Sequence, residues 1–130
     1  MHHSEAMNRT TVLVCITCRY PNEPPPGAQA GVALAQAAAQ AAAAHPQITV
    51  QQVRCLANCS RGLSAAVRRD GGWSYVFGGL NATQDGPALV AGARLMATAT
   101  DGLMPWRERP ESLKRGLIAR LPPSDFDGQQ

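Results

Sequence analysis

The fold is decided by Thr11-Val12-Leu13-Val14-Cys15-Ile16-Thr17-Cys18, an apolar run that ends in two closely spaced cysteines. A second strand-like run, Ile48-Thr49-Val50-Gln51-Gln52-Val53, comes just before a second pair in Cys55-Leu56-Ala57-Asn58-Cys59. The alanine-rich segment 28–44 between the two runs has a high helix propensity and stops at His45-Pro46. This order of strand, helix and strand predicts a βαβ unit with two parallel strands.

The βαβ unit brings the cysteine pairs together. Two parallel neighbouring strands end at the same edge of a sheet, because the crossover helix carries the chain back. We therefore expect all four cysteines of the chain at one edge: Cys15, Cys18, Cys55 and Cys59. Four convergent thiolates suit a metal ion or an iron–sulfur cluster better than they suit a packed core.

The second half of the chain predicts a hairpin and helices. Residues 63–69 and 73–77 read as strands joined by Asp70-Gly71-Gly72, a strong hairpin turn. A helix is expected over about 86–99. Pro110 opens a third short helix, with Leu113, Leu117 and Ile118 facing inward and Pro122-Pro123 closing it.

The element order β-α-β-β-β-α is that of an α/β protein and resembles the thioredoxin-like fold: a βαβ unit followed by a β-hairpin and C-terminal helices. The expected organisation is a flexible arm over 1–10, a single metal- or cluster-binding domain over 11–123, and a polar tail over 124–130. A chain of 130 residues is long enough for one such domain.

Composition excludes some classes of function. The net charge of +3 is too mild to indicate a nucleic-acid partner. No stretch reads as a membrane span, and the first residues lack the order of a secretory signal. We therefore expect a cytoplasmic protein, a compartment in which paired cysteines more often bind metal or act in redox chemistry than form structural disulfides.

Four interpretations of the cysteines stay open on spacing alone. The first is a [2Fe–2S] cluster held by all four, and the second is a four-cysteine zinc site. The third is a thiol–disulfide oxidoreductase that uses Cys15-Ile16-Thr17-Cys18, although a proline-rich loop separates this motif from the helix. The fourth is a set of unreactive buried cysteines or two disulfides. The sequence shows no Ser-His-Asp set, phosphate-binding glycine loop or paired-carboxylate site.

Three stretches resemble a known family: Val14-Cys15-Ile16-Thr17-Cys18-Arg19, then residues 53–62 around the second pair, then Met104-Pro105-Trp106-Arg107-Glu108-Arg109-Pro110-Glu111. The chain is similar, over about 11–123, to a bacterial family of predicted metal-binding proteins of unknown function that resemble thioredoxin-like [2Fe–2S] ferredoxins. The C-x2-C spacing departs from the better-known ferredoxins of this kind, in which the first two cysteines lie much further apart.

The resemblance implies a thioredoxin-like fold with Cys15, Cys18, Cys55 and Cys59 as ligands, and it favours [2Fe–2S] over zinc. It also implies a link to cobalamin (corrin) biosynthesis. The predicted function is a small electron carrier that serves a redox partner protein and has no substrate of its own. A zinc-binding or metal-delivery module is the alternative, and a thiol–disulfide enzyme is the third.

Arginines flank the cysteines: Arg19, Arg54 and Arg61. They are either a solvated rim or charges that favour a reduced cluster and dock an acidic partner. Asn58, Ser60 and Gly62 stand where loop amides donate to sulfur, or serve turn chemistry.

Trp106 begins the most distinctive segment, followed by Arg107, Glu108 and Arg109. We interpret it as a tryptophan that covers the core beside an ion pair, with a partner-binding patch as the alternative.

Overall fold

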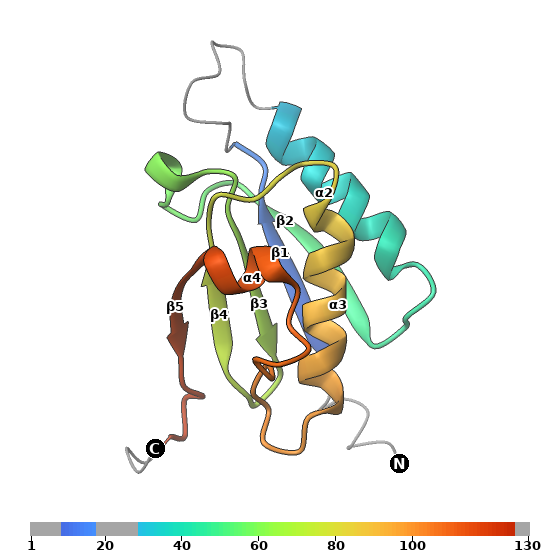
Figure 1. Ribbon diagram of the computed structural model, residues 1–130, viewed down its shortest axis with the longest axis vertical. Coiled ribbons are helices and arrows are strands. Elements are labelled where there is room, and N and C mark those ends of the chain that lie inside the picture. Colours follow the sequence, from blue (N-terminus) through green and yellow to red (C-terminus); the bar gives the residue numbers. More distant parts are fainter. Residues whose placement is uncertain (1–8, 18–28, 127–130) are drawn as a thin grey trace.

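The computed structural model describes residues 9–17 and 29–126, and it contains one five-stranded sheet with three α-helices and a short 3-10 helix. Figure 1 shows their arrangement. The elements in chain order are β1 (Thr10–Cys15), α2 (Gln29–Ala42), β2 (Ile48–Val53), η1 (Cys59–Arg61), β3 (Ala65–Arg69), β4 (Ser74–Phe77), α3 (Asp85–Thr98), α4 (Glu111–Arg115) and β5 (Leu117–Leu121).

The sheet has the strand order β2-β1-β3-β4-β5. β1 pairs in parallel with β2, from Thr10 opposite Ile48 to Cys15 opposite Val53. The remaining pairs are antiparallel, as expected for a hairpin added to a βαβ unit. The parallel pair therefore ends at one edge of the sheet, and both cysteine loops begin there.

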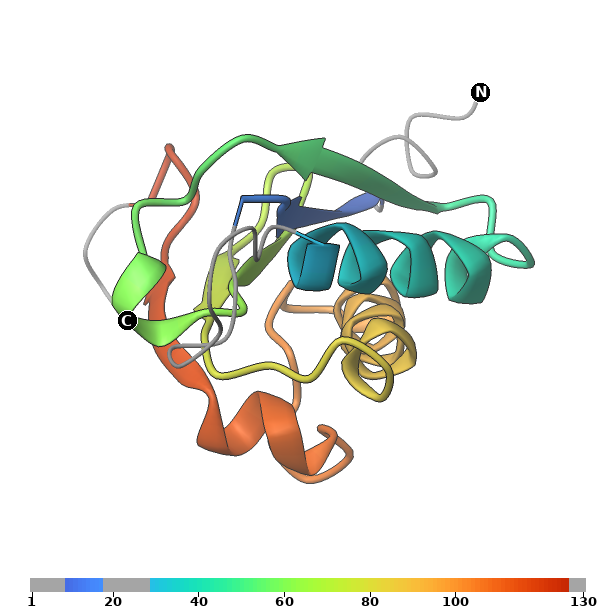
Figure 2. The ribbon, with the colours of Figure 1, turned by 90° about the horizontal axis from the view of Figure 1, so that it is seen from above.

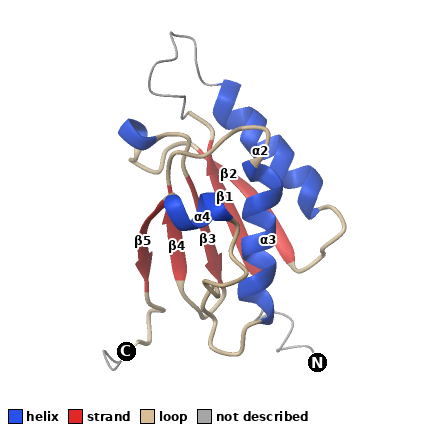
Figure 3. Cartoon of the chain, in the orientation of Figure 1, coloured by secondary structure: helices blue, strands red, loops and turns tan. Residues whose placement is uncertain are grey.

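The helices cover one face of this sheet. Helices α2, α3 and α4 lie on the same side of it in Figure 2, and the elements are coloured by type in Figure 3. The register places Val12, Val67 and Tyr75 in one row across β1, β3 and β4, and all three are buried. The next residue in each strand points to the uncovered face, where Arg68 is exposed.

Small residues let the two long helices approach closely. A Cβ on Gly86 of α3 would lie 2.5 Å from the Cβ of Ala37 in α2, so only glycine fits there. Ala38 and Ala93, also on these helices, are fully buried. None of the described helices is long and apolar enough to cross a membrane.

The fold class predicted from the sequence is confirmed, but the C-terminal helix is partly wrong. Helix α4 ends at Arg115, and Leu117 and Ile118 belong to the edge strand β5. Gly116 separates the two elements: its carbonyl accepts a hydrogen bond from Gly78 N at 2.8 Å, and β5 then pairs with β4. A short apolar run fits either a helix turn or a strand, and here pairing with the sheet decides.

Both ends of the described chain make contacts. Thr10, expected in the arm, is fully buried and starts β1. Phe126, expected in the tail, lies with its ring centroid 5.6 Å from that of Trp73, edge to face. Its ring packs against the hydrophobic core.

Candidate metal centre at the sheet edge

Cys15 is the last residue of β1 and has no solvent exposure. Its amide donates to the carbonyl of Ser64 at 3.1 Å, and the amide of Ile16 donates to the carbonyl of Val53 at 2.9 Å. The chain leaving β1 is thus bonded to segments on both sides. This fixes the position of Cys15 through the sheet itself.

The second cysteine loop lies against the first. The Thr17 hydroxyl donates to the carbonyl of Arg54 at 2.6 Å, and the thiol of Cys15 lies 3.8 Å from the same oxygen. Arg54 directly precedes Cys55, which is exposed. The two loops therefore meet at the end of the parallel pair, the edge that stands uppermost in Figure 1. The only sequence signal for the Thr17 contact is the presence of a threonine inside the first cysteine motif.

The loop from Cys55 to Cys59 curls around its first sulfur. Ala57 has φ 59°, in the left-handed region, and its amide lies 3.2 Å from Cys55 Sγ. Amide donors of this kind stabilise thiolate ligands and are common near iron–sulfur clusters. The structure shows such a donor at Ala57, and the same role for Asn58, Ser60 and Gly62 stays a prediction.

Asn58 connects the second cysteine loop to Ser64. Its side-chain amide donates to Ser64 Oγ at 2.9 Å, and that hydroxyl donates to the Asn58 carbonyl at 3.3 Å. These bonds tie the second loop to the entry of β3. The Gly62–Leu63 peptide bond in between is cis. Asn58 thus holds the loop in place through Ser64.

The described residues show part of the predicted ligand set. Of the two described cysteine side chains, that of Cys15 is buried and that of Cys55 is exposed. Cys59 begins η1, but its side chain, like the whole of Cys18, lies outside the described part of the chain. Within residues 9–17 and 29–126 no group of three or more metal-ligating side chains is found. The four-cysteine site therefore remains a prediction.

The flanking arginines surround the second loop. Arg54 and Arg61 are both exposed, and Arg19 lies outside the described residues. A hollow of about 230 Å³ beside Arg61 is also lined by Arg115 at the end of α4. The sequence did not single out Arg115, whose place near the loop depends on β5 pairing with β4.

The same hollow contains glycines at which backbones approach closely. A Cβ on Gly78 would lie 2.7 Å from the carbonyl oxygen of Arg61, and one on Gly116 would lie 2.5 Å from that of Gly78. The Gly79 amide donates to the Arg61 carbonyl at 2.8 Å. The second loop is therefore braced by the residues that directly follow β4.

Our interpretation of Trp106 as a core cover is wrong, because its side chain is 58% exposed. Instead Arg109 is buried, with its Cζ 5.0 Å from the Trp106 ring centroid and 5.4 Å from that of Tyr75. Lys114 Nζ also lies 5.3 Å from the Trp106 ring. Burial lowers the pKa of Arg109, Arg120 lowers it further, and Tyr75 opposes the shift. The arginine fills the space expected for the tryptophan.

The fold and this edge define a thioredoxin-like α/β protein with cysteine loops at the end of its parallel strands. The chain belongs to the family described as "Protein of unknown function (DUF1636)", whose model matches residues 12–123. The family resemblance predicted from the sequence is thereby confirmed. None of the curated proteins compared with the chain matches it.

The solved structures that are similar include thioredoxin-like [2Fe–2S] ferredoxins from Aquifex aeolicus. The crystal structure of the wild type has a TM-score of 0.55 and 18% identity, covering 85% of this chain and 96% of that one. A second structure of such a ferredoxin has a TM-score of 0.53 and 22% identity, covering 90% and 97%. A variant of that protein with one cysteine changed to serine has a TM-score of 0.53 and 17% identity, covering 85% and 98%. At these identities the likeness shows the fold.

Proposed function

We propose that this protein is a cytoplasmic one-electron carrier that holds a [2Fe–2S] cluster on Cys15, Cys18, Cys55 and Cys59. The observation that carries the proposal is the contact between the two cysteine loops, made by Thr17 Oγ1 and the carbonyl of Arg54 at 2.6 Å. That contact lies at the end of the parallel strands, in a fold shared with [2Fe–2S] ferredoxins. A bound cluster of this type accepts and releases one electron.

The described residues fit such a group. Cys15 supplies a buried sulfur and Cys55 an exposed one, from loops that touch. The Ala57 amide donates toward Cys55 sulfur at 3.2 Å, which would stabilise its thiolate. Thr17 Oγ1 lies 3.6 Å from Cys15 Sγ while its proton is donated to the Arg54 carbonyl, so this threonine contacts both loops beside the buried sulfur. All-sulfur ligation of this kind favours iron–sulfur clusters or zinc over harder cations.

The thiol–disulfide alternative fits less well. An attacking cysteine needs a partly exposed thiol of lowered pKa, often at the start of a helix. Cys15 has no exposure, and the chain beyond it forms a turn at Ile16-Thr17 before α2 begins at Gln29. This environment suits a ligand that is shielded from solvent.

The experiment that tests the proposal is anaerobic purification from cells supplied with iron, followed by metal, sulfide and visible-spectrum analysis. We expect a brown protein with about two irons and about two acid-labile sulfides per chain. Stoichiometric zinc without sulfide and without colour would replace the cluster with the zinc-binding or metal-delivery alternative. A metal-free protein that reduces disulfides would support the third alternative.

The partner of an electron carrier must dock near its cofactor. Arg54 and Arg61 are exposed beside the second loop, and Arg115 shares a hollow with Arg61. We propose that this basic edge receives an acidic face of a redox partner, since complementary charge steers association. The identity of the partner as an enzyme of cobalamin biosynthesis rests on the sequence resemblance alone.

A further inference from the structure

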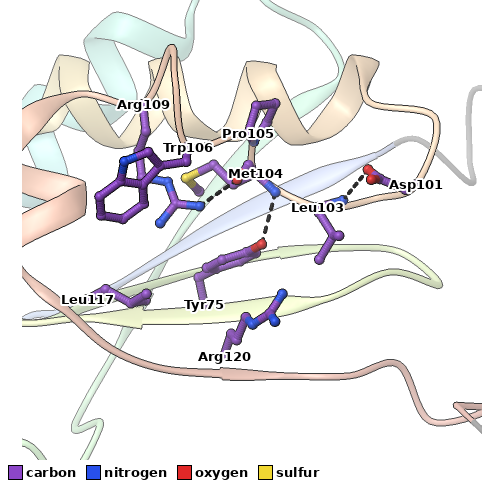
Figure 4. A pocket seen from close by; sticks show the side chains of 9 residues that line it. All are labelled: Tyr75, Asp101, Leu103, Met104, Pro105, Trp106, Arg109, Leu117 and Arg120. Atoms are coloured by element: carbon purple, nitrogen blue, oxygen red, sulfur yellow. Dashed lines mark hydrogen bonds between the residues drawn. The ribbon is translucent and has the colours of Figure 1, made fainter. Parts of the chain in front are cut away.

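A second cavity lies between the loop 101–110 and the strands β4 and β5. Its volume is about 410 Å³, within the range of small-molecule sites. Figure 4 shows Tyr75 and Arg120 on its strand side and the loop residues above them. Trp106 and Arg109, which the proposed electron transfer does not use, line this cavity.

Two guanidinium groups line this cavity and have no carboxylate partner among residues 9–17 and 29–126. Arg109 is only 8% exposed, and its Nη2 donates to the Met104 carbonyl at 2.5 Å. Its Nε has no acceptor among the described residues. Arg120 lies with its Cζ 4.5 Å from the centroid of the Trp73 ring. Neither arginine forms an ion pair with a described carboxylate.

The cavity offers a further donor. The Tyr75 hydroxyl accepts a hydrogen bond from the Met104 amide at 3.0 Å, and among the described residues nothing accepts its own proton. Asp101 is the acidic residue that lines the cavity; its Oδ1 accepts from the Leu103 amide at 3.1 Å. In Figure 4 it stands at the far end from Arg109. At the end of the cavity near Arg109, hydrogen-bond donors and positive charge therefore exceed hydrogen-bond acceptors.

We propose that this cavity is a binding site for a small organic carboxylate with an apolar body. A planar carboxylate matches the guanidinium fork and accepts from a phenol hydroxyl. The apolar part of the ligand would lie against Leu103, Pro105 and Leu117, which line the same cavity. Bound there, the anion compensates two cations, one of which is held away from solvent at a cost in free energy.

The test uses 2-naphthoate as probe and 2-naphthamide, its neutral analogue of the same shape. Each is titrated into ¹⁵N-labelled protein as purified, and the spectra report the Leu103 and Met104 amides and the indole N–H groups of Trp73 and Trp106. We expect saturable shifts with naphthoate and a dissociation constant of about 1 mM or lower, which is ordinary for a ligand of this size. The amide should bind at least ~10-fold more weakly, because it brings no charge.

Arg120→Gln is the informative variant, because Arg120 is exposed on the edge strand. Arg109→Gln would also remove the bond to the Met104 carbonyl and could unfold the loop. We expect Arg120→Gln to weaken naphthoate binding by about 3- to 10-fold and to leave naphthamide unchanged. Arg68→Gln is the matched control: it removes the same charge from an exposed arginine on the uncovered face, and should change neither ligand.

Several outcomes would overturn the proposal. One is the absence of saturable shifts up to ~10 mM naphthoate, beyond any affinity expected of a built site. Another is equal affinity for naphthoate and naphthamide, or equal weakening by the two arginine variants. Shifts of the same signals on diluting the protein without probe would assign the cavity to contact between copies of the chain.

Discussion

The two cysteine loops start at the same sheet edge but are held in different ways. The first follows β1, a strand with neighbours on both sides, and Cys15 is buried with its amide bonded to Ser64. The second follows β2, an edge strand, and Cys55 is exposed. One cysteine is therefore positioned by the sheet, and the other by the packing of its loop.

The packing of the second loop uses local contacts that the sheet does not supply. These contacts are the hydrogen bonds between Asn58 and Ser64 and the hydrogen bond from the Gly79 amide to the Arg61 carbonyl. The left-handed turn at Ala57 also shapes the loop. Loops of this kind open more easily than strands at the centre of a sheet. Removing the cofactor should therefore disturb the second loop more than the first. Mutations in the first loop should affect folding more.

The largest effect is expected from changing the cysteines themselves. Cys15→Ser and Cys55→Ser should each abolish cofactor binding, measured as iron and sulfide per chain. They should differ in the cofactor-free state. Cys15→Ser places a hydroxyl at a site of no exposure and should cost ~1–3 kcal/mol, whereas Cys55→Ser should stay within ~0.5 kcal/mol.

Thermal unfolding of the cofactor-free variants measures this contrast. A loss of ~1 kcal/mol corresponds to a decrease of ~4 °C in Tm for a domain of this size. The cofactor-free Cys55→Ser protein should also melt several degrees below the cofactor-loaded parent if the cofactor braces both loops. If cofactor-free Cys15→Ser and Cys55→Ser have the same Tm, the proposed difference between the two loops is wrong.

A smaller effect on cofactor content is expected from filling the space behind the second loop. In Gly78→Ala the new methyl group would lie 2.7 Å from the Arg61 carbonyl and 3.0 Å from Asn58 Nδ2, so the loop must shift. We expect a loss of ~1–3 kcal/mol and a lower cofactor content, read by melting and by iron analysis.

Gly72→Ala in the hairpin turn is the control for this change. Its new methyl group would lie 3.2 Å from Arg69 Cβ, which needs a shift of only a few tenths of an ångström, so Tm should fall by less than in Gly78→Ala. Unchanged stability and cofactor content in Gly78→Ala would show that the second loop is not braced by β4.

The charges of the second loop should have a smaller effect again, on the reduction potential of the proposed cluster. At ~10 Å and an effective dielectric of ~40–80, each arginine contributes ~0.4–0.8 kcal/mol. This corresponds to ~20–35 mV for one electron. The double variant Arg54→Gln and Arg61→Gln should lower the potential by ~40–70 mV, because the reduced form carries more negative charge.

Protein-film voltammetry measures this shift, and high salt should diminish it. Arg68→Gln, which removes an exposed charge from β3 close to the opposite end of that strand, should leave the potential nearly unchanged. If the double variant keeps the parent potential with an intact cluster spectrum, Arg54 and Arg61 form a solvated rim or serve docking alone.

Much of the fold was predictable because its local signals agree. The alanine-rich segment gives α2, and the Asp70-Gly71-Gly72 turn gives the hairpin, with Gly71 at φ 71°. The meeting of the two cysteine loops followed from the parallel pairing of β1 and β2, and the bond from Thr17 to Arg54 bears it out. In each case a short stretch of sequence carries the information.

The features that were missed depend on tertiary contacts. Leu117 and Ile118 form a strand because β4 offers an unpaired edge, which no local pattern reveals. Trp106 is exposed because Arg109 occupies the space beside Tyr75. A sequence rule that buries large aromatics and exposes arginines fails where a guanidinium stacks between two rings.

The smallest expected effect concerns Ala57, the residue that turns the second loop around Cys55 sulfur. Its φ of 59° costs an alanine ~1 kcal/mol relative to glycine, which adopts this conformation freely. Ala57→Gly also makes the unfolded chain more flexible, which offsets ~0.4–1 kcal/mol of that gain. We therefore expect a net change between ~0 and ~0.6 kcal/mol in favour of the folded state, measured by chemical unfolding of the cofactor-free protein.

Ala119→Gly, at an exposed position in β5, is the matched control and should destabilise by ~0.5–1 kcal/mol, because its backbone is extended. The two substitutions remove the same methyl group, so an opposite sign isolates the turn at Ala57. A β-branched residue there should be markedly worse, and Ala57→Val should lower both stability and cofactor content. If Ala57→Gly destabilises as much as Ala119→Gly, the second loop does not keep its left-handed turn in solution, and the amide directed at Cys55 loses its structural basis.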